Sequence, residues 1–270
     1  MASYLVMLQT NSNQPFIFSS PRLREQIGAS FEITLLSHWV TKAVQGLSSR
    51  NRTGKSKRRT DFWVSDSSGK VIVRFGETDG NPKDLAKQLI RAVTLRALTE
   101  APGLDVTGVF IETSSGPVDP ADLKRLDREF SKYSLNRRPV SARFPQFPFL
   151  QRAEESALPA STPLTDEDEG NIRKYAKDLG VPLLADEEEQ IPTQTGKDRG
   201  RSLSLPSRVK RAWSRSARRL QLEDVVKRQH TSEKPEGTVS NLYEDPFQLE
   251  KAFQDTPDES NAAKAVPELS

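Results

Sequence analysis

Residues Gln14 to Val44 read QPFIFSSPRLREQIGASFEITLLSHWVTKAV, and this stretch governs how the rest of the chain is interpreted. It opens with an aromatic cluster and then runs past Pro21 to Val44 without another proline. Ser20 is suited to accept hydrogen bonds from the first free backbone N–H groups of a helix, and proline is well tolerated at the first helical position. The stretch therefore predicts one long helix that starts at Ser20 and Pro21.

Apolar residues recur through this helix at helical spacing and form a wide arc. One stripe repeats every four residues, and a second stripe lies beside it. The first contains Leu23, Ile27, Phe31, Leu35 and Trp39, and the second contains Ile33, Leu36, Val40 and Val44. An arc of this width predicts a helix that is mostly buried.

The flanking segments predict a mixed fold with alternating strands and helices. Tyr4 to Leu8 is a nearly continuous apolar run, which is typical of a strand buried on both faces. Two apolar runs around Asp66-Ser67-Ser68-Gly69 predict an antiparallel hairpin. Asn81-Pro82 and Asp119-Pro120 each predict the capped start of a helix. A strand is predicted between these two helices, from Val106 to Ile111. The order is that of an α+β, ferredoxin-like βαββαβ domain with an extra helix.

Composition predicts that only part of the chain is packed. The 270 residues are 34% hydrophobic and 29% charged, with 18 prolines, and the mean hydropathy is −0.64. We expect a folded domain over residues 1–150 and a charged, proline-rich linker and tail over residues 151–270. That tail is predicted to be largely disordered, with short helices from Pro206 to His230 and from Asn241 to Gln254, neither of which makes a core alone.

The absence of cysteine excludes disulfides, thiolate zinc sites and cysteine nucleophiles. The apolar run from Tyr4 to Leu8 is too short for a signal peptide or a membrane span. We therefore expect a cytoplasmic protein with no membrane partner. His38 and His230 are the only histidines, and His38, beside Trp39, is interpreted as a partly buried structural residue.

The opening of the long helix also resembles a known family. The pattern Gln14, Phe16-Ile17-Phe18, Ser19, Leu23-Arg24 and Gly28-Ala29-Ser30 resembles the first palm domain in the large subunit of type III CRISPR effector complexes, and the similarity covers roughly residues 1–150. That family contains two palm domains related to nucleotidyl cyclases and polymerases, and its active members make cyclic oligoadenylates from ATP. The resemblance implies a palm-type domain in antiviral defence.

The residues of this chain do not meet the demands of two-metal catalysis. Two divalent ions need convergent carboxylates, commonly at the end of the first strand and at the hairpin turn. Here the first strand is followed by Thr10-Asn11-Ser12-Asn13, and the turn offers a single acid, Asp66, where the family's catalytic palm has two glycines and two aspartates. Asp79-Gly80-Asn81 superficially resembles a metal-binding motif of that palm, but it is better explained as a turn and a helix cap. We expect no catalytic residues and no metal site in this chain alone.

The resemblance implies a nucleotide site shared between two palms, with ATP and Mg²⁺ bound only when a second, catalytic palm-domain protein is present. Free N–H groups at a helix start and nearby arginines attract phosphate. The alternative is that the aromatic residues are core, Ser20 is only a cap, and Gly28-Ala29 permits helix packing. The candidate nucleotide-binding residues are Phe16, Ser19, Ser20, Arg22 and Ser30.

Two basic tracts predict a different function, contact with RNA or DNA. One is the loop over residues 50–59, and the other spans residues 199–219 and includes Trp213, which is suited to base stacking. A solvated basic face, or a scaffold whose charged tail folds on a partner, explains the same tracts. The candidate nucleic-acid contacts in the loop are Arg50, Arg52, Lys55, Lys57, Arg58 and Arg59.

Overall fold

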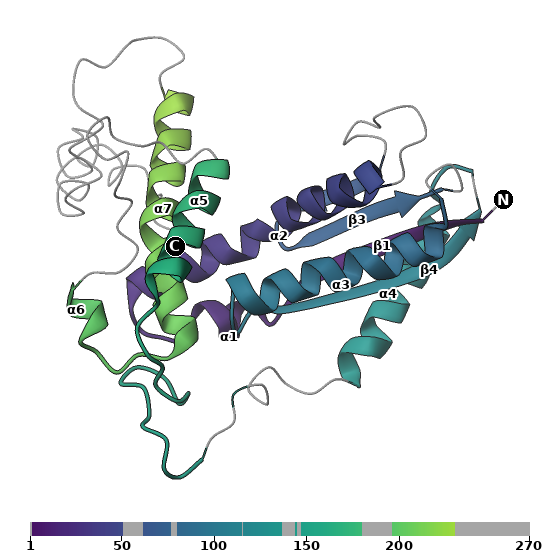
Figure 1. The fold of residues 1–270 in the computed structure, drawn as a ribbon. Helices are drawn as coiled ribbons and strands as arrows, with labels where there is room; N and C mark the ends of the chain where they lie inside the picture. Colours follow the sequence, from purple (N-terminus) through teal and green to yellow (C-terminus); the bar gives the residue numbers. More distant parts are fainter. Residues whose placement is uncertain are drawn as a thin grey trace, which may run out of the picture.

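The computed structural model describes residues 2–50, 62–76, 80–114, 116–136, 144, 147–179 and 196–229. Within these ranges the chain forms a four-stranded antiparallel sheet and a set of helices (Figure 1). The strands are β1 (Ala2–Asn11), β2 (Trp63–Ser67), β3 (Lys70–Phe75) and β4 (Asp105–Ser114). The helices are α1 (Asn13–Ile17), α2 (Leu23–Arg50), α3 (Pro82–Glu100), α4 (Pro120–Leu135), α5 (Asp166–Asp178), α6 (Gly196–Arg199) and α7 (Leu205–Gln229).

The sheet has the strand order β2-β3-β1-β4, so the first strand lies inside the sheet. Val6 of β1 is paired with Val73 of β3 on one side and with Phe110 of β4 on the other. Leu5 to Leu8 are fully buried because helices cover both faces of the sheet at this strand. The predicted α+β class, the hairpin and the central buried strand are confirmed.

Two hydrophobic clusters show which helices cover which face. The larger cluster joins the even-numbered residues of β1 to α2 and α3, and its largest fully buried side chain in α2 is Trp39. The smaller cluster lies on the opposite face, where Leu5 and Met7 pack against Leu126 of α4. Figure 1 shows α2 and α3 running side by side along the sheet, with α4 below it.

The starts of α3 and α4 follow the predicted capping pattern. The side chain of Asn81 accepts a hydrogen bond from the backbone N–H of Asp84, and Pro82 occupies the first turn. Asp119 caps α4 in the same way by accepting from the N–H of Ala121 at 2.9 Å. The interpretation of Asn81 as a helix cap is therefore confirmed.

The start of the long helix differs from the prediction. The structure divides the stretch into a short helix, α1, and a long helix that begins at Leu23 rather than at Ser20 and Pro21. The Ser20 hydroxyl accepts a hydrogen bond from the N–H of Arg22, only two residues on, at 3.2 Å. The first helical hydrogen bonds run instead to the Arg22 carbonyl. Ser20 thus closes a turn before the helix and does not cap it.

The helix expected over Pro206 to His230 is present as α7, but its packing was not predicted. α7 crosses the N-terminal half of α2, with α5 beside it (Figure 1). Its apolar face joins the larger cluster through Val209, Ala212, Trp213 and Ala217. The expected helix over 241–254 lies outside the described residues.

Candidate functional site

The predicted nucleotide-binding residues lie in one segment, from Asn13 to Phe31, which we call the α1–α2 segment. The structure brings Phe16 and Ser19 together beneath a side chain from α7. The Lys210 ammonium group donates hydrogen bonds to the Phe16 carbonyl oxygen at 2.7 Å and to the Ser19 hydroxyl at 2.9 Å. It also lies 3.9 Å from the centre of the Phe16 ring. The Lys210 ammonium group and the Ser19 hydroxyl thus already have partners within the chain.

The other predicted residues have different surroundings. Ser20 is buried and its hydroxyl is used in the turn to Arg22. Arg22 is largely exposed and forms an ion pair with Glu155 at 3.0 Å. Ser30 is exposed on α2, between the buried residues Ala29 and Phe31. Phe16 itself is buried, as the packing alternative predicts.

Gly28 marks the point where α2 and α7 cross. A Cβ atom built on Gly28 would overlap the carbonyl oxygen of Lys210 and would lie 2.9 Å from the Cα of that residue. Two helices approach this closely only where one of them has no side chain at the crossing. Gly28 and Ala29 therefore serve helix packing in this structure.

A buried ionic network joins α2 to α7 beside this crossing. Arg211 is its centre, and its guanidinium group contacts three carboxylates at distances of 2.6–2.9 Å. These are Glu25, Glu155 and Asp198, and Asp198 also pairs with Arg24 at 2.8 Å. Burial opposes the charged form of Glu155, but hydrogen bonds with Glu25, Arg201 and Arg211, together with the charge of Arg211, lower its pKa from 4.5 to about 2.

Glu32 lies in the same interface without such partners. It is fully buried, and neither of its carboxylate oxygens has a hydrogen-bond partner. Burial raises the pKa of Glu32 well above its usual value, and the charge of Lys210 lowers it only in part. Burial likewise lowers the pKa of Lys210, against the charges of Glu32 and Glu25. The pair is therefore an electrostatically costly feature of the α2–α7 contact.

The described part of the basic tract over 199–219 is largely engaged in contacts within the chain. Arg199 pairs with Glu169 at 3.1 Å, and Arg201 pairs with Glu154 at 2.7 Å. Arg208 donates to the backbone carbonyl oxygens of residues 161, 198 and 201. Trp213, the expected base-stacking residue, is buried against the rings of Phe31 and Tyr175. In the described part of this tract, these side chains are therefore engaged within the fold, and the prediction of nucleic-acid contact stays a prediction.

The basic loop cannot be placed in the same way. Arg50 is the last residue of α2, and Arg52, Lys55, Lys57, Arg58 and Arg59 lie outside the described residues. His38, interpreted as structural, is half-buried and meets the Tyr175 ring edge-on at 5.0 Å.

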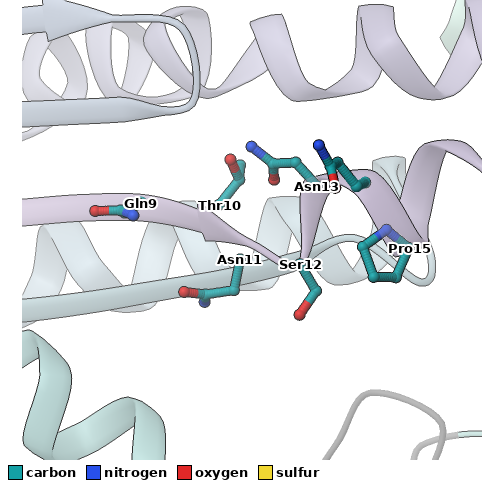
Figure 2. Close-up of a pocket in the computed structure, with 7 residues that line it drawn as sticks. Gln9, Thr10, Asn11, Ser12, Asn13 and Pro15 are labelled. Carbon is teal, nitrogen blue, oxygen red and sulfur yellow. The ribbon is translucent and has the colours of Figure 1, made fainter.

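The end of β1 is the position where a catalytic palm would carry metal-binding carboxylates. A pocket of about 340 Å³ lies there, lined by residues 9–15. Figure 2 shows Asn11 and Ser12 pointing to one side of β1 and Thr10 and Asn13 to the other. None of the lining residues is a carboxylate, so they do not fit a pair of Mg²⁺ ions.

Two acids, one on the neighbouring strand β4 and one on the hairpin, accept hydrogen bonds within the chain. Asp105 accepts a hydrogen bond from the Asn11 amide at 3.3 Å, and the same amide donates to Thr107 at 2.8 Å. Asp66 of the hairpin accepts from the hydroxyl of Ser37 on α2. No group of three or more metal-ligating side chains was found in the described part of the chain. The pocket lining at the end of β1 is therefore uncharged and rich in amides, with Asp105 of β4 beside it.

Sequence reasoning missed the residues that dominate the α2–α7 contact. Lys210 and Arg211 were assigned to a basic, accessible tract, yet both are buried. A signal was present in the spacing of Glu25 and Glu32, which lie seven positions apart on one helical face. Carboxylates on an otherwise apolar face indicate a cationic partner.

Among the described residues, none of the helices is both long and apolar enough to cross a membrane.

No protein-family model matches the chain, and no curated protein matches it. Among solved structures, it is similar to a chain from the cryo-EM structure of the Type III-B Cmr-beta bound to cognate target RNA, with a TM-score of 0.40 and 14% identity. The similarity covers 86% of this chain and 35% of that chain. This is a distant structural similarity to a type III CRISPR effector chain, and at this TM-score the function has to be argued from the residues themselves.

Proposed function

We propose that this chain is a non-catalytic palm-type module of an antiviral defence system and that it pairs with a second, catalytic palm through the α1–α2 segment. The ferredoxin-like sheet and the resemblance of residues 14–30 to a first palm domain support this proposal. The neutral end of β1 supports the non-catalytic role, because Asn11 stands where a metal-binding palm needs a carboxylate. ATP and Mg²⁺ would then be held chiefly by the partner.

The exposure of two large apolar side chains is the observation that supports the proposed pairing. Phe18 and Leu23 flank the turn between α1 and α2, and their exposed fractions are 65% and 64%. Large apolar side chains this exposed are common one at a time, but two that flank one short turn are suited to a protein contact. The turn between them includes Ser19, Ser20 and Arg22, three of the predicted nucleotide-binding residues.

The test uses the full chain and a separately produced palm domain that carries the two-glycine, two-aspartate hairpin, with ATP and Mg²⁺. Replacing Phe18 and Leu23 together with aspartate should weaken association at least about tenfold, because burying two new charges at an interface is costly. Leu135→Asp is the matched control, since Leu135 is 86% exposed at the end of α4, which packs on the opposite face of the sheet. Equal loss in the control, or unchanged affinity in the double variant, would reject this surface.

Contact with RNA or DNA through residues 50–59 is the alternative proposal. Replacing Arg58 and Arg59 with glutamate should weaken nucleic-acid binding and flatten its salt dependence. Unchanged binding would count against it.

A further inference from the structure

Helix α7 covers part of the α1–α2 segment through which we propose that the chain pairs with its partner. Its Lys210 binds the Phe16 carbonyl oxygen and the Ser19 hydroxyl, and its backbone lies directly over Gly28. Trp213, one turn further along, packs against Phe31 with the two rings tilted and their centres 5.4 Å apart. The part of α2 that has the smallest side chains is therefore already occupied by a helix of the same chain.

Helix α7 is held against α2 by charged groups as well as by apolar ones. Arg211 is 7% exposed and makes ion pairs with Glu25, Glu155 and Asp198, which come from α2, from the segment before α5 and from α6. Compared with apolar residues of the same volume, a buried ion-pair network contributes little net stability. Loss of one member is nevertheless strongly destabilising, because the remaining buried charges are left without a partner. Contacts inside one chain that are this polar resemble transient protein interfaces more than permanent cores.

Uncompensated polar atoms add to the cost of the contact. The oxygens of Glu32 and the indole N–H of Trp213 are buried without a hydrogen-bond partner. Buried polar groups of this kind are satisfied when the helices separate and water enters. The α2–α7 contact thus combines an ion-pair network around Arg211, which holds the helices together, with buried polar groups that favour their separation.

We propose that α7 is a releasable cover of the α1–α2 segment, latched by Arg211, and that its release exposes the segment to the partner palm. The regulatory half of this inference rests on the proposed function. Release would uncover Gly28, Ala29 and Phe31 and the carboxylates of Glu25 and Glu32 on the same face of α2, together with the carbonyl group of Phe16 that Lys210 now holds. Gly28 and Ala29 leave little side-chain bulk at the centre of this face, so a helix of the partner can approach it as closely as α7 does.

The first test measures hydrogen exchange in the full chain, comparing amides of α7 with those of β1. Arg211→Met removes the latch, and Gly28→Leu drives α7 away by steric overlap. Each should speed exchange in α7 at least about tenfold and leave β1 protected, because local opening exposes only the released helix. The matched controls are Arg125→Met, at an exposed ion pair on α4, and Gly46→Leu, where a new side chain meets nothing within 4 Å.

Two results would contradict the proposal that α7 is a releasable cover. Exchange that rises equally in α7 and β1 would show that α7 unfolds only with the whole domain. Exchange that does not change in either variant would show that Arg211 and Gly28 do not govern its release.

The second test measures affinity of the Arg211→Met chain for the catalytic palm. Arg211 lies outside the pairing surface, so the variant should bind at least about fivefold more tightly than the wild type, because the binding-competent population increases. Faster α7 exchange with unchanged affinity would overturn the regulatory role. Faster α7 exchange in Arg211→Met, with no binding to the catalytic palm by the variant or by the wild type, would reject the proposed function. The release of α7 would then still be supported by the exchange result.

Discussion

The carbonyl oxygen of Lys210 occupies the place where any side chain at position 28 would begin, so α7 crosses α2 at Gly28 in direct backbone contact. This relationship ties a residue of the N-terminal resemblance motif to a helix far along the chain. It also explains why a glycine is present inside a long helix, where it would otherwise be unfavourable.

Gly28→Ala should lower the free energy of unfolding by about 1–3 kcal/mol, because the added methyl group overpacks the helix crossing. Gly46→Ala on the same helix should raise it by about 0.5–1 kcal/mol, since Gly46 has open space around it and alanine favours the helix. Urea unfolding followed by circular dichroism measures both. A stabilising effect at position 28 would show that the crossing is not packed as described.

Trp213→Ala should lower the free energy of unfolding by about 3–5 kcal/mol, because it removes a large side chain that is only 1% exposed. Tyr133→Ala on α4 is the matched control. Its ring is 56% exposed, so the change should be within about 0.5 kcal/mol. Thermal unfolding of the two variants beside the wild type is sufficient. A loss at Trp213 no larger than at Tyr133 would mean that α7 does not contribute to the core.

The ion pairs of Glu155 should make the stability of the fold depend on pH in the acidic range. Its pKa is lower in the folded chain, at about 2, than the usual value of 4.5. A depressed folded pKa stabilises the fold above the unfolded pKa, and this contribution is lost as pH falls from about 4.5 towards 2. The wild type should therefore lose more stability than Glu155→Gln when pH falls from 5 to about 3. Parallel losses in the two proteins would contradict the assigned ion pairs.

Asn11→Asp should place a carboxylate directly opposite Asp105, its cross-strand partner in β4. Like charges opposite one another in a sheet repel, so the variant should lose about 1 kcal/mol of stability at neutral pH. Mg²⁺ should restore part of the loss, and sodium chloride of matched ionic strength should restore less, because a divalent ion bridges two carboxylates. A melting temperature that responds equally to both salts would show that this end of the sheet cannot be converted to a metal site.

Much of the fold followed from local patterns. Asn81-Pro82 and Asp119-Pro120 identified two helix starts correctly, since capping depends on neighbouring residues only. The apolar run Tyr4 to Leu8 identified the central strand because burial on both faces requires continuous hydrophobicity. The start of α2 was misplaced, because Ser20 can close a turn as readily as it can cap a helix.

The site was harder to predict than the fold. Lys210 and Arg211 were interpreted as accessible because lysine and arginine are seldom buried unless they are paired. Their partners, among them Glu25 and Asp198, are far away in the sequence, so local pattern could not pair them. Phe16 and Ser19, predicted to bind a nucleotide, both contact Lys210, a residue of α7 that local pattern could not connect to them.

The most direct measurement is sedimentation velocity of the full chain mixed with a catalytic palm, with and without ATP and Mg²⁺. Ser30→Trp is compared with Gln45→Trp, since both residues are exposed on α2 but only Ser30 lies in the α1–α2 segment. We predict an ATP-dependent complex for the wild type and for Gln45→Trp, and none for Ser30→Trp. An undiminished complex with Ser30→Trp would contradict pairing through the α1–α2 segment.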